Sequence, residues 1–188
     1  MTMKKSQRKT VFRAVLGLCF LAVGSRAAEA QTTVTLPDTS QTTLFTATVS
    51  EQARVIVPAS VSFSVTNVAN TTVAASATVT IDRIVLATAT KQLKVSVQAG
   101  AAAFTPPVVG ATTWSAGDIS WNAATWTRAT GASGTLSSSA FTQIATCDAN
   151  AADCSTTGLI FTLGAKPTVL RSGSHTIVVT WKVESIGS

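Results

Sequence analysis

Apolar and polar residues alternate along several short segments of this chain after about residue 30. The alternation is clearest in residues 73–81, 93–98 and 176–183, and residues 61–65 repeat it. Because successive side chains of a β-strand point to opposite faces, each segment is predicted to be a strand with one buried face. The inward positions predicted for the three clearest segments are Val73, Ala75, Ala77, Val79, Ile81, Leu93, Val95, Val97, Ile177, Val179, Trp181 and Val183.

Helix-period spacing of apolar residues is missing after residue 30. Short strand-like segments follow one another instead, separated by Gly, Pro, Asn and Ser residues that favour turns. This pattern predicts an all-β protein in which two antiparallel sheets pack as a sandwich. A single domain over residues 31–188 suits this length, and a closed barrel is the alternative that strand counting leaves open.

The first 30 residues have the composition of a secretory signal peptide. Basic residues precede the apolar run 14–23, and small residues follow it up to Ala28 and Ala30. As a helix this run would span only about 15 Å, half of a bilayer core of about 30 Å, so we expect no permanent membrane anchor. Cleavage after Ala30 would make Gln31 the first residue of a secreted protein, in the periplasm, outside the cell or on its surface.

The basic character of the whole chain comes from this signal peptide. The chain holds 14 Lys and Arg residues against 8 Asp and Glu residues, a formal net charge of +6, but six of the basic residues and one acidic residue precede residue 31. The mature chain keeps eight scattered basic residues and seven acidic ones. Because a nucleic-acid binder needs a basic surface that releases counterions, we exclude nucleic acid as a partner.

Cysteine content predicts one disulfide. Removal of the signal peptide removes Cys19 and leaves Cys147 and Cys154 as the only thiols. In an oxidising compartment they are predicted to pair, and the short loop that they close leads us to expect a local constraint more than a constraint on the fold. Two cysteines and one histidine do not make a four-ligand zinc set, so we predict neither a metal nor another cofactor.

The end of the chain carries a motif in residues 171–183, where Gly173 and His175 are followed by Val179 and Trp181. This segment resembles the Gly-x-Tyr-x-x-x-Val-x-Trp ending of secreted bacterial immunoglobulin-like domains, including spore-coat-U-type and usher-type pilin subunits, with histidine in place of tyrosine. Residues 57–63 resemble an early strand of the same group. The resemblance implies an immunoglobulin-like sandwich.

No catalytic set is recognisable in the sequence. His175 is the only histidine, and no Gly-x-Ser-x-Gly elbow accompanies it. The acidic residues lie mostly in predicted turns or on exposed strand faces, with no spacing that pairs two carboxylates. We therefore predict that the protein is not an enzyme.

Three tryptophans, Trp114, Trp121 and Trp126, fall within thirteen residues of a chain that is otherwise poor in aromatic residues. Exposed tryptophan rings in secreted sandwiches can stack on sugar rings, so the three are candidate ligand-binding residues. The alternative is packing in the core, which the strand spacing of Ile119 and Trp121 favours.

Residues 31–50 form a candidate amino-terminal arm. In the pilins that the chain resembles, such an arm completes the sheet of the next subunit by pairing with its exposed edge. The alternative is that this segment forms ordinary strands of a complete sandwich. The apolar positions that would alternate in the arm are Val34 and Leu36, or Phe45, Ala47 and Val49.

Together these patterns predict a non-enzymatic structural protein that is secreted or held at the cell surface. A subunit of a fibre or coat is the specific version, with copies of itself or other surface subunits as partners. An extracellular carbohydrate-binding module that uses the three tryptophans is the alternative.

Overall fold

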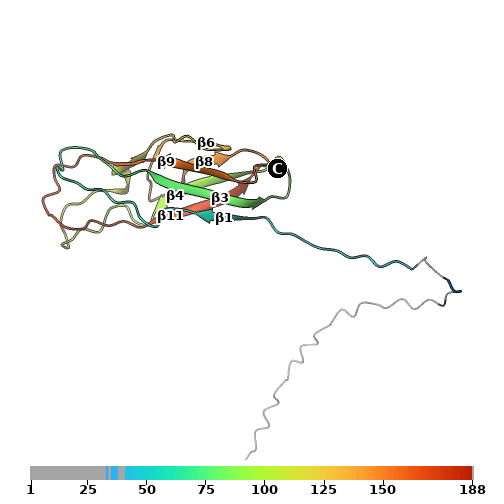
Figure 1. The fold of residues 1–188 in the computed structure, drawn as a ribbon. Coiled ribbons are helices and arrows are strands. Elements are labelled where there is room, and N and C mark those ends of the chain that lie inside the picture. Colours follow the sequence, from blue (N-terminus) through green and yellow to red (C-terminus); the bar gives the residue numbers. More distant parts are fainter. Residues whose placement is uncertain (1–32, 34, 38–40, 188) are drawn as a thin grey trace, which may run out of the picture. The chain divides into compact units, whose positions relative to one another are not determined.

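The computed structural model describes residues 33, 35–37 and 41–187 (Figure 1). The predicted signal peptide and its cleavage site at Ala28, Ala30 and Gln31 lie outside these residues. The described residues up to Thr46 and those from Ala47 onward belong to two separate units, and the second unit contains every strand. Within the described part of the chain, no helix is long and apolar enough to cross a bilayer.

The second unit is all-β, as the alternation predicted, with one short 3₁₀ turn. Its elements are β1 (Gln52–Ile56), β2 (Thr72–Val73), β3 (Ala77–Val85), β4 (Gln92–Ala99), η1 (Ala116–Asp118), β5 (Ile119–Trp121), β6 (Ala129–Gly131), β7 (Gly134–Thr135), β8 (Thr142–Cys147), β9 (Cys154–Leu159), β10 (Phe161–Leu163) and β11 (Val179–Ile186). Turn residues join them, and no long helix intervenes in the described residues.

The strands form three antiparallel sheets that build two layers (Figure 1). One sheet has the order β11-β4-β8-β6. The other two have the orders β1-β3-β9 and β2-β10-β5-β7. Because β2 leads into β3, β9 leads into β10, and these pieces pair with each other, the two smaller sheets continue into a single layer. The protein is therefore a β-sandwich.

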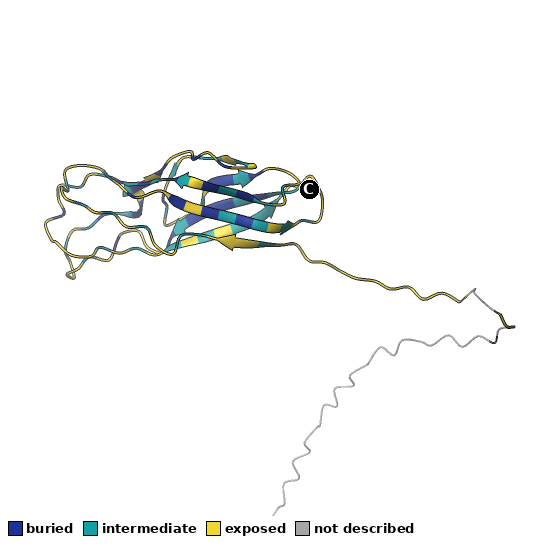
Figure 2. Ribbon diagram, viewed as in Figure 1, coloured by how far each residue is buried: buried dark blue, intermediate teal, exposed yellow. Residues whose placement is uncertain are grey.

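Burial along the central strands follows the predicted alternation (Figure 2). Every predicted inward residue of β4 is buried, and in β3 Val79 and Ile81 have no exposed surface. The prediction is wrong at Val73, which is 61% exposed, and at Ala75, which is also exposed. Residues 74–76 leave the ladder between β2 and β3 and reverse the order of inward and outward positions, so that Ala74 is buried instead.

Two other alternating segments do not form strands. Residues 61–65 are extended and alternate between half-buried and exposed side chains, but they belong to no sheet. Residues 41–50 also form no strand, and every one of their side chains is exposed. Alternation thus predicted that both segments are extended, but within the described residues neither segment has a neighbouring strand in a sheet.

The predicted disulfide between Cys147 and Cys154 is present, with the two Cα atoms 5.8 Å apart. Cys147 ends β8 in one layer and Cys154 begins β9 in the other, so the bridge joins the two layers. Both cysteines are buried in one cluster with Ile81, Leu93 and Val95. The bridge closes the short loop between β8 and β9 and at the same time fastens the two layers to each other at one end of the core.

Candidate functional site

An apolar groove of about 1010 Å³ runs along one side of the sandwich. Two extended segments form its rims: residues 57–66, which follow β1, and residues 174–178, which precede β11. The groove therefore lies between an edge of one layer and an edge of the other. Its floor consists of core side chains, among them Phe104, Trp114, Ile119, Leu136, Phe161 and Leu163.

The first rim, residues 57–66, turns apolar side chains inward but has no backbone partner. Val57, Val61, Phe63 and Val65 are half-buried and pack against the main core cluster. Among the described residues, no backbone hydrogen bond involves residues 57–66. This rim is an extended chain held by its side chains alone, and its peptide groups are free to pair with another strand.

The second rim, residues 174–178, is paired on its inner side only. Thr176 exchanges both backbone hydrogen bonds with Thr105, at 2.7 and 3.0 Å, and the Val178 carbonyl accepts a bond of 2.8 Å from the Gly100 amide. Ile177 lies between them and makes no backbone hydrogen bond within the described residues. Because β11 is also the last strand of its sheet, an open edge runs along this side of the groove.

The opposite side of the sandwich is closed. There β6 and β7 are the outermost strands of the two layers, and only two residues connect them. Trp121 Nε1 donates a hydrogen bond of 3.0 Å to the Ala132 carbonyl in this connection. The chain therefore covers one side of its core itself and leaves the groove side without a covering strand.

At one end of the groove, His175 fastens the second rim to the floor. Its ring meets Trp114 edge-on at a centroid distance of 5.2 Å. Nε2 lies 3.1 Å from the Arg171 carbonyl and Nδ1 lies 2.7 Å from Thr113 Oγ1. Because a carbonyl only accepts, Nε2 carries a proton, and in the neutral ring Nδ1 then accepts from the threonine hydroxyl. Both ring nitrogens are thus used in structural hydrogen bonds.

Asp118 organises the turn that carries the groove floor. Its carboxylate accepts hydrogen bonds from Lys166 Nζ at 2.7 Å and from the Ser115 amide and hydroxyl at 2.7 and 2.9 Å. Burial acts to raise the pKa of Asp118, but these hydrogen bonds outweigh burial and lower the pKa below its ordinary value. The Asp118 carbonyl accepts from the Gly164 amide at 2.7 Å, which ties this turn to the segment after β10.

The three candidate tryptophans are buried. Trp114 and Trp121 are each 4% exposed and Trp126 is 8% exposed. Trp114 contributes to the groove floor, while Trp121 packs edge-on against Phe161 at a centroid distance of 6.2 Å. None of the rings offers an open face on which a sugar could stack. The carbohydrate-binding alternative therefore loses the residues on which it was based.

The residues that define the groove were not predicted as a site. Sequence alternation marks Val61, Phe63 and Ile177 as inward-facing, and all three are half-buried. Alternation reports which face of a segment is covered, but it does not report whether the backbone has a neighbour. Only the fold shows that, within the described residues, neither the first rim nor the outer side of the second rim has a neighbouring strand.

Comparison of the chain with family models, curated proteins and solved structures finds no match. The resemblance of residues 171–183 to the ending of pilin-type subunits stays a prediction. Function is therefore inferred from the physical properties of the groove and of residues 41–50.

Proposed function

We propose that this protein is a non-enzymatic subunit of a secreted or cell-surface fibre or coat. Its domain is an immunoglobulin-like sandwich that lacks one edge strand. The arm of one copy supplies that strand to the groove of another copy. The observation that carries this proposal is the groove between two open backbone edges, because an apolar surface with unpaired peptide groups on both rims suits an added strand.

Residues 41–50 of the arm have the chemistry that such a groove requires. Phe45, Ala47 and Val49 fall on one side of an extended chain, and Thr46 and Thr48 fall on the other. Phe45 is 90% exposed and Val49 is 70% exposed. Burying a side chain of this size contributes about 1.5–3 kcal/mol. Burial of Phe45 and Val49 in an apolar groove would therefore favour binding of the arm.

The arm is long enough to pair with the straight part of the first rim. Residues 41–50 span roughly 33 Å at about 3.3 Å per residue, whereas the first rim bends at Ala59 and Thr66 and has at Pro58 a residue without an amide hydrogen. An added strand can therefore pair with residues 60–65 of this rim. Its other edge would face β11 and the second rim, so one strand would join both layers.

We expect purified protein that begins at Gln31 to form a ladder of oligomers, measured by size-exclusion chromatography with light scattering. Phe45→Asp should convert the ladder to monomers, because a charged side chain cannot enter the apolar groove without a large desolvation cost. Leu44→Asp is the matched control: Leu44 is equally exposed but lies on the other side of the arm, so the ladder should remain.

Two outcomes would contradict the proposal. The first is a wild-type protein that stays monomeric at all concentrations, which would mean that the arm covers the groove of its own chain or that the groove stays open. The second is a ladder that survives Phe45→Asp, which would mean that another surface drives assembly.

A further inference from the structure

We infer that neighbouring copies also touch end to end, with an apolar tip of one copy seated in a hollow at the base of the next. This inference rests on the proposed function, because arm insertion brings the two ends together. The tip consists of the loops 106–110 and 169–173. The base consists of the loops 86–91 and 148–153. Both belong to the same unit of the structure.

The tip exposes aliphatic side chains on ordered loops. Val109 is 100% exposed, Leu170 is 83% exposed and Val108 is 56% exposed. The two loops support each other, since a side chain at Gly173 would come within 2.7 Å of Pro107 Cβ. The backbone hydrogen bonds between Thr105 and Thr176 and the ring contacts of His175 hold the loops from behind. The tip is therefore an apolar projection whose loops are held in place by contacts with each other and with the groove floor.

The base carries a small hollow of about 240 Å³ whose walls expose polar and apolar atoms in nearly equal measure. Its walls come from the β3–β4 connection and from the loop that the disulfide closes. The lining residues are Ile84, Leu86, Ala87, Thr88, Ala89, Asn150, Ala151 and Ala152. The small alanine side chains leave room for a side chain of another copy. The disulfide holds the wall that is formed by the loop between Cys147 and Cys154.

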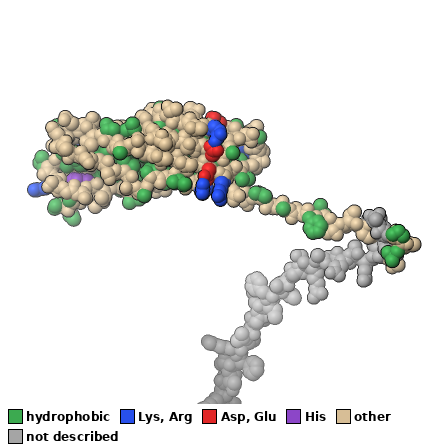
Figure 3. Space-filling model, in the orientation of Figure 1, with side chains coloured by type: hydrophobic (Ala, Val, Ile, Leu, Met, Phe, Trp, Pro, Cys, Tyr) green, Lys and Arg blue, Asp and Glu red, His purple; other side chains and the backbone are tan. Residues whose placement is uncertain are grey.

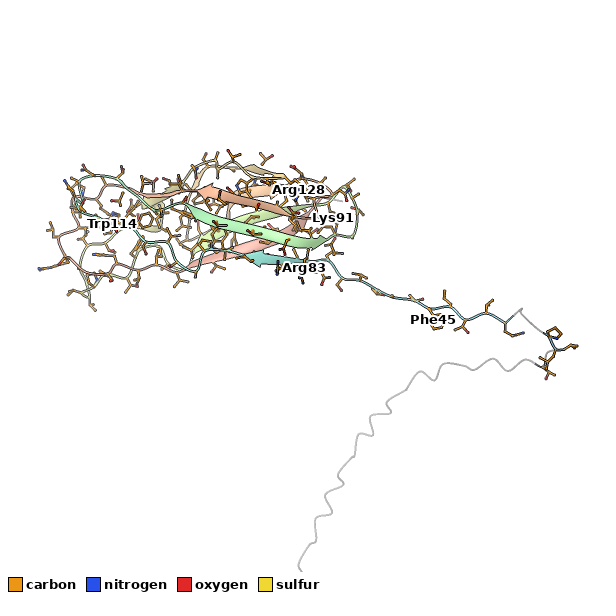
Figure 4. All side chains as sticks on the ribbon, viewed as in Figure 1. Phe45, Arg83, Lys91, Trp114 and Arg128 are labelled. Atoms are coloured by element: carbon orange, nitrogen blue, oxygen red, sulfur yellow. A yellow bond between two sulfur atoms is a disulfide. The ribbon has the colours of Figure 1, made fainter. Side chains whose placement is uncertain are left out.

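Tip and base lie at opposite ends of the sandwich. Figure 4 places Trp114 near one end and Arg83, Lys91 and Arg128 toward the other. Trp114 contacts His175 behind the tip loops, and Lys91 closes the base connection. A contact between different surfaces at two opposite ends is heterologous, and it builds an open chain rather than a closed ring.

The arm leaves the sandwich at the base. Gln52, the first residue of β1, pairs with Val85 at the end of β3. The Glu51 carboxylate accepts hydrogen bonds from the Ala87 amide at 2.8 Å and from Lys91 Nζ at 2.9 Å. Ala87 itself lines the hollow. Any copy that lends its arm must therefore bring its base close to the groove that receives it.

The groove, in turn, ends at the tip. Residues 169–174 line the groove, and most of them also belong to the tip loop. An arm that enters from this end carries the base of its own subunit onto the tip of the receiving subunit. Three side chains cover far less area than the roughly 1,200 Å² of a standard interface, so the tip contact adds to arm insertion rather than replacing it.

Charge at the two ends agrees with this arrangement. Most charged side chains visible in Figure 3 gather in one band near the base, where ion pairs join Arg54 to Asp82 and Lys91 to Glu51. Within the described residues, Arg171 at the tip and Asp148 at the base take part in no ion pair. Arg83, toward the base, is also in none of these ion pairs, so the base keeps one negative and one positive charge, and Asp148 is the one that can align with Arg171.

Cysteine cross-linking between two variants tests the inference. Protein with Val109→Cys is mixed with protein that carries Ala89→Cys, both otherwise full length from Gln31, and the mixture is oxidised. The expected product is a heterodimer of the two variants in at least tenfold excess over any product from Val109→Cys mixed with Val73→Cys. Val73 is the control because it is 61% exposed and belongs to neither the tip loops nor the base loops.

Each outcome has a distinct meaning when oligomers are sized in the same samples. Oligomers that form without the Val109–Ala89 cross-link overturn the end-to-end contact and leave the proposed function intact. Cross-linked homodimers of Val109→Cys overturn it as well, because they indicate a symmetric contact of two tips. Samples that form no oligomers at all overturn both proposals.

Discussion

Gly131→Ala is expected to lower the free energy of unfolding by about 3 kcal/mol, at the upper end of the range for overpacked cores. A Cβ atom at this position would lie 2.2 Å from the Ala124 carbonyl oxygen and 2.9 Å from Trp126 Cδ1. The nearest atom belongs to the backbone, so no rotamer change relieves the contact. Gly131 ends β6 beside the buried Trp126 ring, and the substitution should therefore separate β6 from its neighbours.

Gly117→Ala is the matched control for this prediction. The same added methyl group at Gly117 meets no atom within 4 Å, so the unfolding free energy should stay within about 0.5 kcal/mol of wild type. Urea unfolding followed by tryptophan fluorescence measures both variants. Equal stability of Gly131→Ala and Gly117→Ala would show that the packing around Trp126 is looser than described.

Ile177→Asp is expected to weaken binding of a neighbour's arm at least a hundredfold, because an apolar wall of the groove becomes charged at a cost of about 3 kcal/mol. Ile177 is half-buried, lines the groove and sits where the second rim has an unpaired backbone. Thr180→Asp is the control, since Thr180 is exposed and is not among the residues that line the groove. Oligomers should disappear in the first variant and persist in the second.

A mixture of two defective variants separates loss of the groove from loss of folding. The Ile177→Asp variant keeps an unchanged arm, and the Phe45→Asp variant keeps an unchanged groove. Each should be monomeric alone, and together they should form a dimer through one arm and one groove, seen by light scattering. A mixture that stays monomeric while both variants keep wild-type circular dichroism would contradict insertion of the arm.

Much of the sandwich is predictable from the sequence because alternation records burial directly. The inward residues of β4, together with Val79 and Ile81 of β3, are where the pattern places them. Val73 and Ala75 are the exceptions, because residues 74–76 leave the ladder and change which positions face inward, and no local signal in the sequence marks that break. The pairing of Cys147 with Cys154 follows from counting thiols, but its position between two layers depends on the topology.

The candidate site is less predictable because it is defined by an absence of pairing. Phe63 and Ile177 look like core residues of ordinary strands in the sequence, and they are half-buried in the fold. Only the strand order shows that β1 and β11 are edges and that no strand covers the space between them in the described residues. Trp114 is a candidate ligand-binding residue in the sequence because aromatic residues are rare there, but its ring is buried in the groove floor.

Hydrogen exchange measured by mass spectrometry tests the central claim most directly. The Phe45→Asp variant, whose groove is unchanged, is compared with and without a synthetic peptide that corresponds to residues 41–50. We predict that the peptide slows exchange at least tenfold in residues 60–65 and at Ile177, because their free amides gain strand partners. A peptide with the Phe45→Asp change should have no effect. Unchanged exchange with the wild-type peptide, or protection of these amides before any peptide is added, would contradict the account.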